Sequence, residues 1–174
     1  TAINATIDEN SSTSLNGVTV TADLTLNSIA DISQVANSAI DVSGNANFIT
    51  VADVTLNSGA NVFGSISASA NNITISETDG SDLNGITALT DFSLNSGANI
   101  NQTAASTIEV GSNASLTTAN NITLAGNSNN FGSLTLAAAD ASIVESSDTV
   151  LDAVAVANLT LTSVGNISQT DSSG

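Results

Sequence analysis

The stretch TSLNGVTVTADLTLNS occupies residues 13–28, and SDLNGITALTDFSLNS occupies residues 81–96. The second stretch repeats the pattern of the first, and the likeness extends well beyond both. Residues 1–68 align with residues 69–136 without a gap, and 29 of the 68 pairs are identical. A slip of one residue would turn every strand side chain to the opposite face, so a gapless match of this length indicates an architecture that stacks copy on copy.

A third, partial copy covers the remainder of the chain. After one deletion, residues 159–170 (LTLTSVGNISQT) match residues 92–103 (FSLNSGANINQT). We therefore expect one continuous segment over residues 1–174, built from the sequence repeats 1–68, 69–136 and 137–174, the last of them partial.

Within each copy the apolar residues follow a period of two, in short pieces with apolar ends and a polar middle residue. Examples are Leu24–Leu26, Ile40–Val42, Ile73–Ile75, Ile108–Val110 and Leu134–Leu136. This alternation, rich in β-branched residues, predicts short strands whose apolar ends face a core. It places Asp41 and Glu109 on the outside. Asn, Ser, Gly and Asp, which favour turns, separate the pieces, and no stretch shows a helical period.

About nine short strands per copy are most simply arranged as about three coils of three strands, on the order of 22 residues per coil. If the polar segments 8–17 and 76–85 form a loop that grows out of one coil, the other coils average about 19 residues. The pattern therefore predicts an all-β fold, a parallel β-solenoid. At a spacing of about 4.8 Å per coil the rod is roughly 35–40 Å long. We expect the four phenylalanines, Phe48, Phe63, Phe92 and Phe131, to fill its core.

Several segments resemble the repeats of very large bacterial surface exoproteins, the filamentous-haemagglutinin-type repetitive adhesins. They are ANNITLAG (119–126), NNFGSLTL (129–136), ANLTLTS (157–163) and GNISQT (165–170). The resemblance covers nearly the whole chain, and it rests on the general character of the repeats rather than on one diagnostic motif. It implies a right-handed β-helix, secretion, and an extracellular or cell-surface location on a bacterium, as part of a rod-like stalk. The complete loss of Lys and Arg departs from that family's usual composition.

The composition excludes several classes of function. The chain has 16 Asp plus Glu and no Lys, Arg or His, which gives a formal charge of −16. Without a cation it cannot hold a nucleic-acid backbone, and no apolar run approaches the ~20 residues of a membrane span. It also lacks Cys and Tyr, so the usual catalytic bases and nucleophiles are missing. Carboxylate pairs can hydrolyse glycosides, but nothing marks such a pair here. We predict that the protein is not an enzyme.

The best chemical candidate is a calcium loop. Glu77, Asp79 and Asp82 lie close together in the sequence, and Gly80 permits a sharp turn between them. Oxygen ligands in a flexible loop suit Ca²⁺, although the spacing matches neither an EF-hand nor a calcium β-roll. The other interpretation is a solvated acidic loop. No cofactor is required by the sequence, and Ca²⁺ is the one that it suggests.

Two functions compete at this point. The chain is either a structural rod or filament-forming segment, or an adhesin module that binds glycans or a receptor on a host or neighbouring cell. The ends fall inside a repeat and have no capping segment, and exposed strand edges favour stacking. We therefore expect the partner to be a second copy of the chain or further repeats of a longer one. Aromatic residues gathered on one outward face would favour the adhesin, and the sequence shows no such group.

Overall fold

The computed structural model describes residues 1–170, which form nineteen strands and no helix. The strands are β1 (Ala5–Glu9), β2 (Thr13–Leu15), β3 (Val18–Val20), β4 (Leu24–Ser28), β5 (Ile32–Gln34), β6 (Ile40–Ile49), β7 (Val54–Leu56), β8 (Val62–Ala70), β9 (Ile73–Glu77), β10 (Ser81–Ala88), β11 (Phe92–Ser96), β12 (Ile100–Gln102), β13 (Ile108–Thr118), β14 (Ile122–Leu124), β15 (Asn130–Ala137), β16 (Asp140–Glu145), β17 (Thr149–Ala155), β18 (Asn158–Ser163) and β19 (Ile167–Gln169). Residues 171–174 of the predicted segment lie outside the described range. Within this range no helix is long and apolar enough to cross a membrane.

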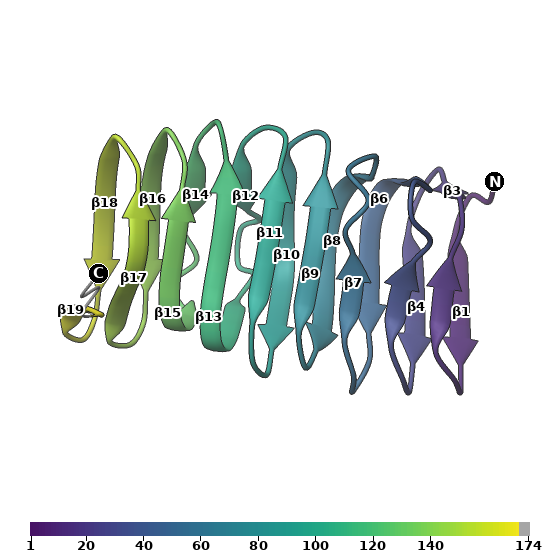
Figure 1. Ribbon diagram of the computed structural model, residues 1–174, viewed down its shortest axis with the longest axis horizontal. Helices are drawn as coiled ribbons and strands as arrows, with labels where there is room; N and C mark the ends of the chain where they lie inside the picture. Colours follow the sequence, from purple (N-terminus) through teal and green to yellow (C-terminus); the bar gives the residue numbers. More distant parts are fainter. Residues whose placement is uncertain (171–174) are drawn as a thin grey trace.

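The strands wind into a single coil. Neighbouring strands of successive turns pair in parallel, as β1 pairs with β4, β4 with β6 and β6 with β8. Figure 1 shows them stacked along one long axis, from β1 at one end to β18 and β19 at the other. The prediction of an all-β parallel β-solenoid is confirmed. Its right-handedness stays a prediction that rests on the resemblance.

The number of residues per turn varies along the rod, as the pairing of stacked strands shows. The shortest turns advance the chain by 17 positions and the longest by 22. Two of the series of stacked core positions show how the repeat relates to the turns. One contains Ala5, Leu24, Ala46, Ile66 and Leu83, and the other contains Ile32, Val54, Ile73, Phe92 and Ala114.

Leu24 and Phe92 occupy the same place in the sequence repeat, yet they belong to different series. The prediction of about three turns per copy is confirmed. Three turns lead from Leu24 to Leu83, and a further nine residues, about half a turn, lead to Phe92, the equivalent of Leu24. One copy is therefore about three and a half turns long. Ala46 and Ala114, and Ile66 and Leu134, are likewise equivalent in the repeat and lie in different series.

A continuous apolar core fills the coil. Leu24 and Leu26 of β4 are fully buried, and the core extends from Leu15 to Ile143 as one cluster. The predicted inward ends of the apolar triads are thus confirmed, as are the exposed positions of Asp41 and Glu109. All four phenylalanines are buried, as expected. Phe48 and Phe63 pack edge to face, with ring centroids 6.0 Å apart and an interplanar angle of 74°, a favourable arrangement for an aromatic pair.

The glycines of the two LNG sequences have a backbone role. Gly17 has a φ of 71° and Gly85 a φ of 106°, in a region of backbone angles that residues other than glycine rarely adopt. Gly85 lies where the register between β8 and β10 shifts, between Leu83 and Ile86. This β-bulge lets one strand continue around the coil while changing its pairing.

The prediction of an acidic loop over residues 8–17 and 76–85 was wrong. In the second copy β9 ends at Glu77 and β10 begins at Ser81, so only residues 78–80 form a turn. Glu77 and Ser81 are buried. Their polar atoms are satisfied because the Ser81 hydroxyl donates to Glu77, and the Phe63 N–H of the neighbouring turn also donates to Glu77. Longer connections occur elsewhere, for example at residues 35–39 and 103–107.

Asparagine and aspartate side chains tie successive turns together at the corners. In each case a side-chain oxygen accepts a hydrogen bond from the backbone N–H of the stacked residue one turn later. Asp23 accepts from Asn45, Asp31 from Asp53, Asn72 from Asp91, Asp91 from Asn113 and Asn99 from Asn121, at 2.9–3.3 Å. This explains why the repeats are rich in Asn and Asp: either residue supplies the acceptor.

One turn position tests the conformational rule directly. Asn37 and Ala105 are equivalent in the repeat, and both have a left-handed backbone, with φ of 62° and 64°. Asn tolerates this region and Ala does not, at a cost of roughly 1 kcal/mol. We expect Ala105→Asn to raise the melting temperature by about 2–4 °C, as measured by circular dichroism. Asn37→Ala, the reciprocal change, should lower it, and equal melting temperatures for all three proteins would contradict the strain.

Candidate functional site

The three carboxylates of the predicted calcium loop have different surroundings. Glu77 points into the core and is 5% exposed. Asp79 lies on the exposed turn beside it, and Asp82 lies on β10, where it accepts a hydrogen bond from the Asn101 amide at 3.2 Å. The structure therefore brings Glu77 and Asp79 together but directs Asp82 to another partner. Among residues 1–170, no group of three or more Asp, Glu, His or Cys could hold a metal ion.

Glu77 joins two turns of the solenoid. Its Oε1 accepts a hydrogen bond from the Phe63 backbone N–H of the preceding turn at 2.9 Å, and its Oε2 accepts one from the Ser81 hydroxyl. Burial raises the pKa of Glu77 to about 7, and the neighbouring Asp79 adds to this rise, while the two hydrogen bonds oppose it. The site can therefore bind a proton near neutral pH.

The same place is built in a similar way in the third copy and differently in the first. Glu145 is fully buried and accepts hydrogen bonds from the Phe131 N–H and the Thr149 hydroxyl. In the first copy Glu9 is exposed, and the hydroxyl of Thr13 is enclosed with no hydrogen-bond partner among the residues described. The arrangement of a buried glutamate with a hydroxyl four residues later is thus complete in two of the three copies.

A second enclosed polar group is an amide pair formed by Gln34 and Asn61, of which Asn61 is fully buried. The Asn61 amide nitrogen donates to Gln34 Oε1 at 2.9 Å, and Asn61 Oδ1 accepts from Gln34 Nε2 at 2.6 Å and from the Ile40 backbone N–H at 3.0 Å. Gln102 and Asn129 repeat this arrangement in the second copy, with Ile108 as the backbone donor.

Sequence reasoning did not predict these amide pairs. Gln34 with Gln102 and Asn61 with Asn129 are identical pairs in the repeat alignment, so a signal was present. The alignment could not reveal that Gln34 and Asn61, which are far apart along the chain, meet inside the coil.

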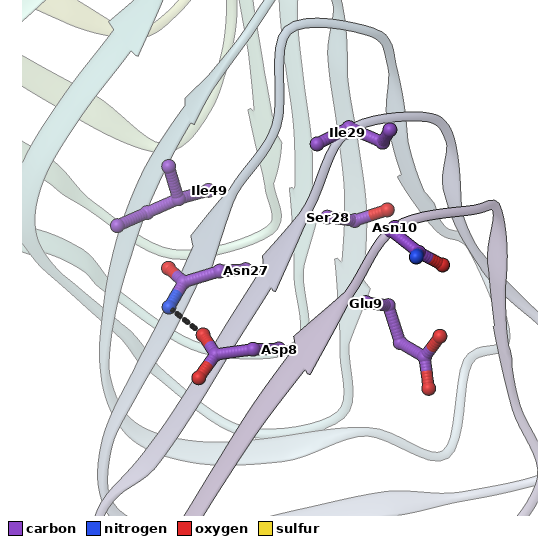
Figure 2. Close-up of a pocket in the computed structure, with 7 residues that line it drawn as sticks. All are labelled: Asp8, Glu9, Asn10, Asn27, Ser28, Ile29 and Ile49. Atoms are coloured by element: carbon purple, nitrogen blue, oxygen red, sulfur yellow. Dashed lines mark hydrogen bonds between the residues drawn. The ribbon is translucent and has the colours of Figure 1, made fainter.

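A shallow groove lies at the corner of the first three turns, with a volume of about 450 Å³. Ile29 and Ile49 form its apolar part and are 64% and 42% exposed. Asp8 and Glu9 give it acidic groups, and the Asn27 amide donates to Asp8 at 2.6 Å (Figure 2).

The second copy does not repeat the lining of this groove. The residues that replace Asp8, Ile29 and Ile49 in the second copy are Ser76, Gly97 and Thr117. An apolar surface with an acidic rim suits a ligand that carries both an aliphatic part and a positive charge.

The comparison with protein families assigns the chain. Residues 2–69 and 70–138 each match the family described as repeats of unknown function, DUF5649. The chain belongs to this family, and the two matched units coincide closely with the two complete copies of the sequence repeat, 1–68 and 69–136. No curated protein matches the chain, and no solved structure matches it.

The amide pair is expected to be a major contributor to stability. Asn61→Ala would leave the Ile40 N–H and the Gln34 side chain without their partners inside the coil. The loss should be about 2–4 kcal/mol in the free energy of unfolding, measured by denaturant titration. Asn57→Ala removes an exposed asparagine from the same turn and should change stability by less than about 0.5 kcal/mol. Similar losses for both variants would contradict the role of the pair.

Calcium should act on the whole charge rather than on one loop. A site formed by Glu77, Asp79 and Asp82 would require Glu77 to leave its buried hydrogen bonds. Divalent cations should nevertheless reduce the repulsion among 16 carboxylates. We expect millimolar Ca²⁺ and Mg²⁺ to raise the melting temperature equally, in the parent protein and in Asp82→Asn. A rise specific to Ca²⁺ that Asp82→Asn abolishes would establish the calcium loop instead.

Proposed function

We propose that the chain is a structural rod or filament-forming segment of a secreted, acidic, repetitive surface protein, serving as a stalk, an extracellular fibre or a matrix scaffold. The observation that carries this proposal is the unbroken stacking of turns: parallel pairing links each turn to the next from β1 to β19. Such a coil separates its two ends by a fixed distance and resists bending, which is what a stalk or fibre requires.

The enclosed polar groups support the same function. Glu77 and Asn61 bond to residues of neighbouring turns, so their hydrogen bonds hold the stack together rather than being left free for a ligand. The corner asparagines and aspartates act in the same way. The polar residues that recur in the repeat thus strengthen the rod along its axis.

The charge and composition of the chain support an extracellular location. A charge of −16 with no Lys, Arg or His keeps separate rods apart and soluble. The absence of Lys and Arg also removes every cleavage site of trypsin-like proteases. Both properties suit a bacterial surface or matrix, the location that the resemblance implies.

A second candidate is an adhesin module, and the groove favours it. Ile29 and Ile49 are exposed on a surface that carries no large apolar side chain at the equivalent places of the second copy. A receptor segment or glycan derivative carrying a positive charge fits the acidic rim of Asp8 and Glu9. In this function the rod would present the groove at a distance from the cell.

Imaging and scattering separate the two functions. A single chain of about nine turns should be a rod roughly 40 Å long, measured by small-angle X-ray scattering. Electron microscopy of the native assembly should show long uniform fibres if the segment builds a filament. Isolated short rods at high protein concentration would count against self-assembly and favour an adhesin or stalk fragment. A compact globular scattering profile would contradict both.

A further inference from the structure

The interior of this protein contains an acidic group for which the chain has no positive side chain as a partner. Glu77 is 5% exposed, and the sequence holds no Lys, Arg or His that could neutralise it. An ionised carboxylate is costly to bury, and a protein usually offsets this with a cation, with hydrogen-bond donors or with a bound proton. The side chains of this protein cannot supply the first of these.

The number of donors distinguishes Glu77 from its equivalent in the third copy. Glu145 accepts hydrogen bonds from the Phe131 N–H, the Thr149 hydroxyl and also the Ser147 hydroxyl at 3.1 Å. Three donors therefore surround its carboxylate.

Glu77 has only two donors among the described residues, the Phe63 N–H and the Ser81 hydroxyl. At the place of Ser147 the second copy carries Asp79, which raises the pKa of Glu77 by its charge and by a hydrogen bond between the two side chains. An ionised Asp79 cannot donate, and its charge repels a second carboxylate. A proton placed between the two carboxyl groups removes the repulsion and supplies the missing hydrogen bond.

We propose that Glu77 and Asp79 form a proton-binding site that strengthens the contact of β9 with β8 and β10 as the surroundings become mildly acidic. The site takes one proton from solvent and holds it between the two carboxyl groups. Asp79 is the charged group that acts on Glu77. The strands β8 and β10 present the uncharged donors Phe63 and Ser81 to it. The strands that pair with β9 on either side, β7 and β11, carry no charged residue, and Ser96 of β11 stacks on Glu77. The site is independent of whether the rod forms filaments or carries an adhesive groove.

The direction of the pH effect follows from linkage. The pKa of Glu77 is about 7 in the folded chain, against an ordinary value of 4.5. Between these two values the folded state binds more protons than the unfolded state, so stability falls as pH rises through this window and levels off above about 7. The extra stability is therefore present in mild acid and lost in neutral to alkaline conditions.

The direct test is the carboxyl ¹³C chemical shift in protein labelled at its four glutamates, Glu9, Glu77, Glu109 and Glu145. The Glu77 resonance should titrate with a midpoint of about 7, and it should be absent from Glu77→Gln. Asp79→Ser gives Glu77 the surroundings that Glu145 has, and should lower that midpoint. The serine already stands at residues 11 and 147, so this variant is compatible with the fold.

Stability provides a second readout. From about pH 5.5 to about pH 8 the folding equilibrium constant of the parent protein should fall by roughly thirtyfold from Glu77 alone. Glu77→Gln should remove this part of the fall. Glu9→Gln, which removes an exposed glutamate at the same repeat position, should leave it intact.

The outcomes decide the proposal in either direction. A Glu77 resonance that titrates at the ordinary position of a glutamate would overturn it without any variant. A midpoint unchanged by Asp79→Ser would remove Asp79 from the site, and the shared-proton geometry would be wrong. Equal pH profiles for Glu77→Gln and Glu9→Gln would show that the buried carboxyl does not couple protons to folding.

Discussion

The register between one turn and the next is the constraint on which the whole molecule depends. Each residue stacks on an equivalent residue one turn away, as Leu24 stacks on Ala46 and Phe92 on Ile73. A side chain must therefore suit its own environment and also the residues above and below it. This explains the narrow set of residue types: β-branched and leucine side chains inside, Asn and Asp at corners, and glycine where backbones approach closely. At Gly64, for example, an added Cβ would clash with the Ser43 carbonyl oxygen.

Enclosed polar groups obey the same constraint. Their partners come from neighbouring turns, so a polar side chain can be buried wherever the turns beside it provide the complementary group. Gln34 with Asn61 meets this condition fully, and its repetition as Gln102 with Asn129 shows that the solution belongs to the repeat. The Glu77 place meets it less completely, because Asp79 replaces the hydroxyl donor. One substitution within an otherwise repeated arrangement is enough to give a structural position a chemical property.

Much of the architecture could be predicted from the sequence, because the core depends on a local pattern. The period-two triads identified the inward residues, and the gapless repeat identified stacking; the buried positions of Phe48 and Phe131 followed from both. The half turn at the end of each copy could not be predicted, since the length of a turn varies along the rod and only the pairings define it. The acidic segment 76–85 was misjudged for a related reason. Its polarity suggested solvent, while the Phe63 N–H that helps to bury Glu77 lies in a different turn.

The carboxylates are arranged so that repulsion between successive turns of the rod stays small. With no Lys, Arg or His in the chain, carboxylates are stabilised by hydrogen-bond donors, by solvent, by protons or by cations from solution. The corner aspartates use donors: the backbone N–H groups of Asn45 and Asn113 bond to Asp23 and Asp91. Asn at the next turn interrupts the line of charges, so two carboxylates seldom stack directly. Repulsion along the axis is then weakest where the turns must hold together, and the remaining negative charge faces outward, where it keeps one rod from another. The same acidic composition that separates rods sideways is therefore compatible with tight stacking lengthwise, and the pH of the surroundings acts on both through the carboxyl groups.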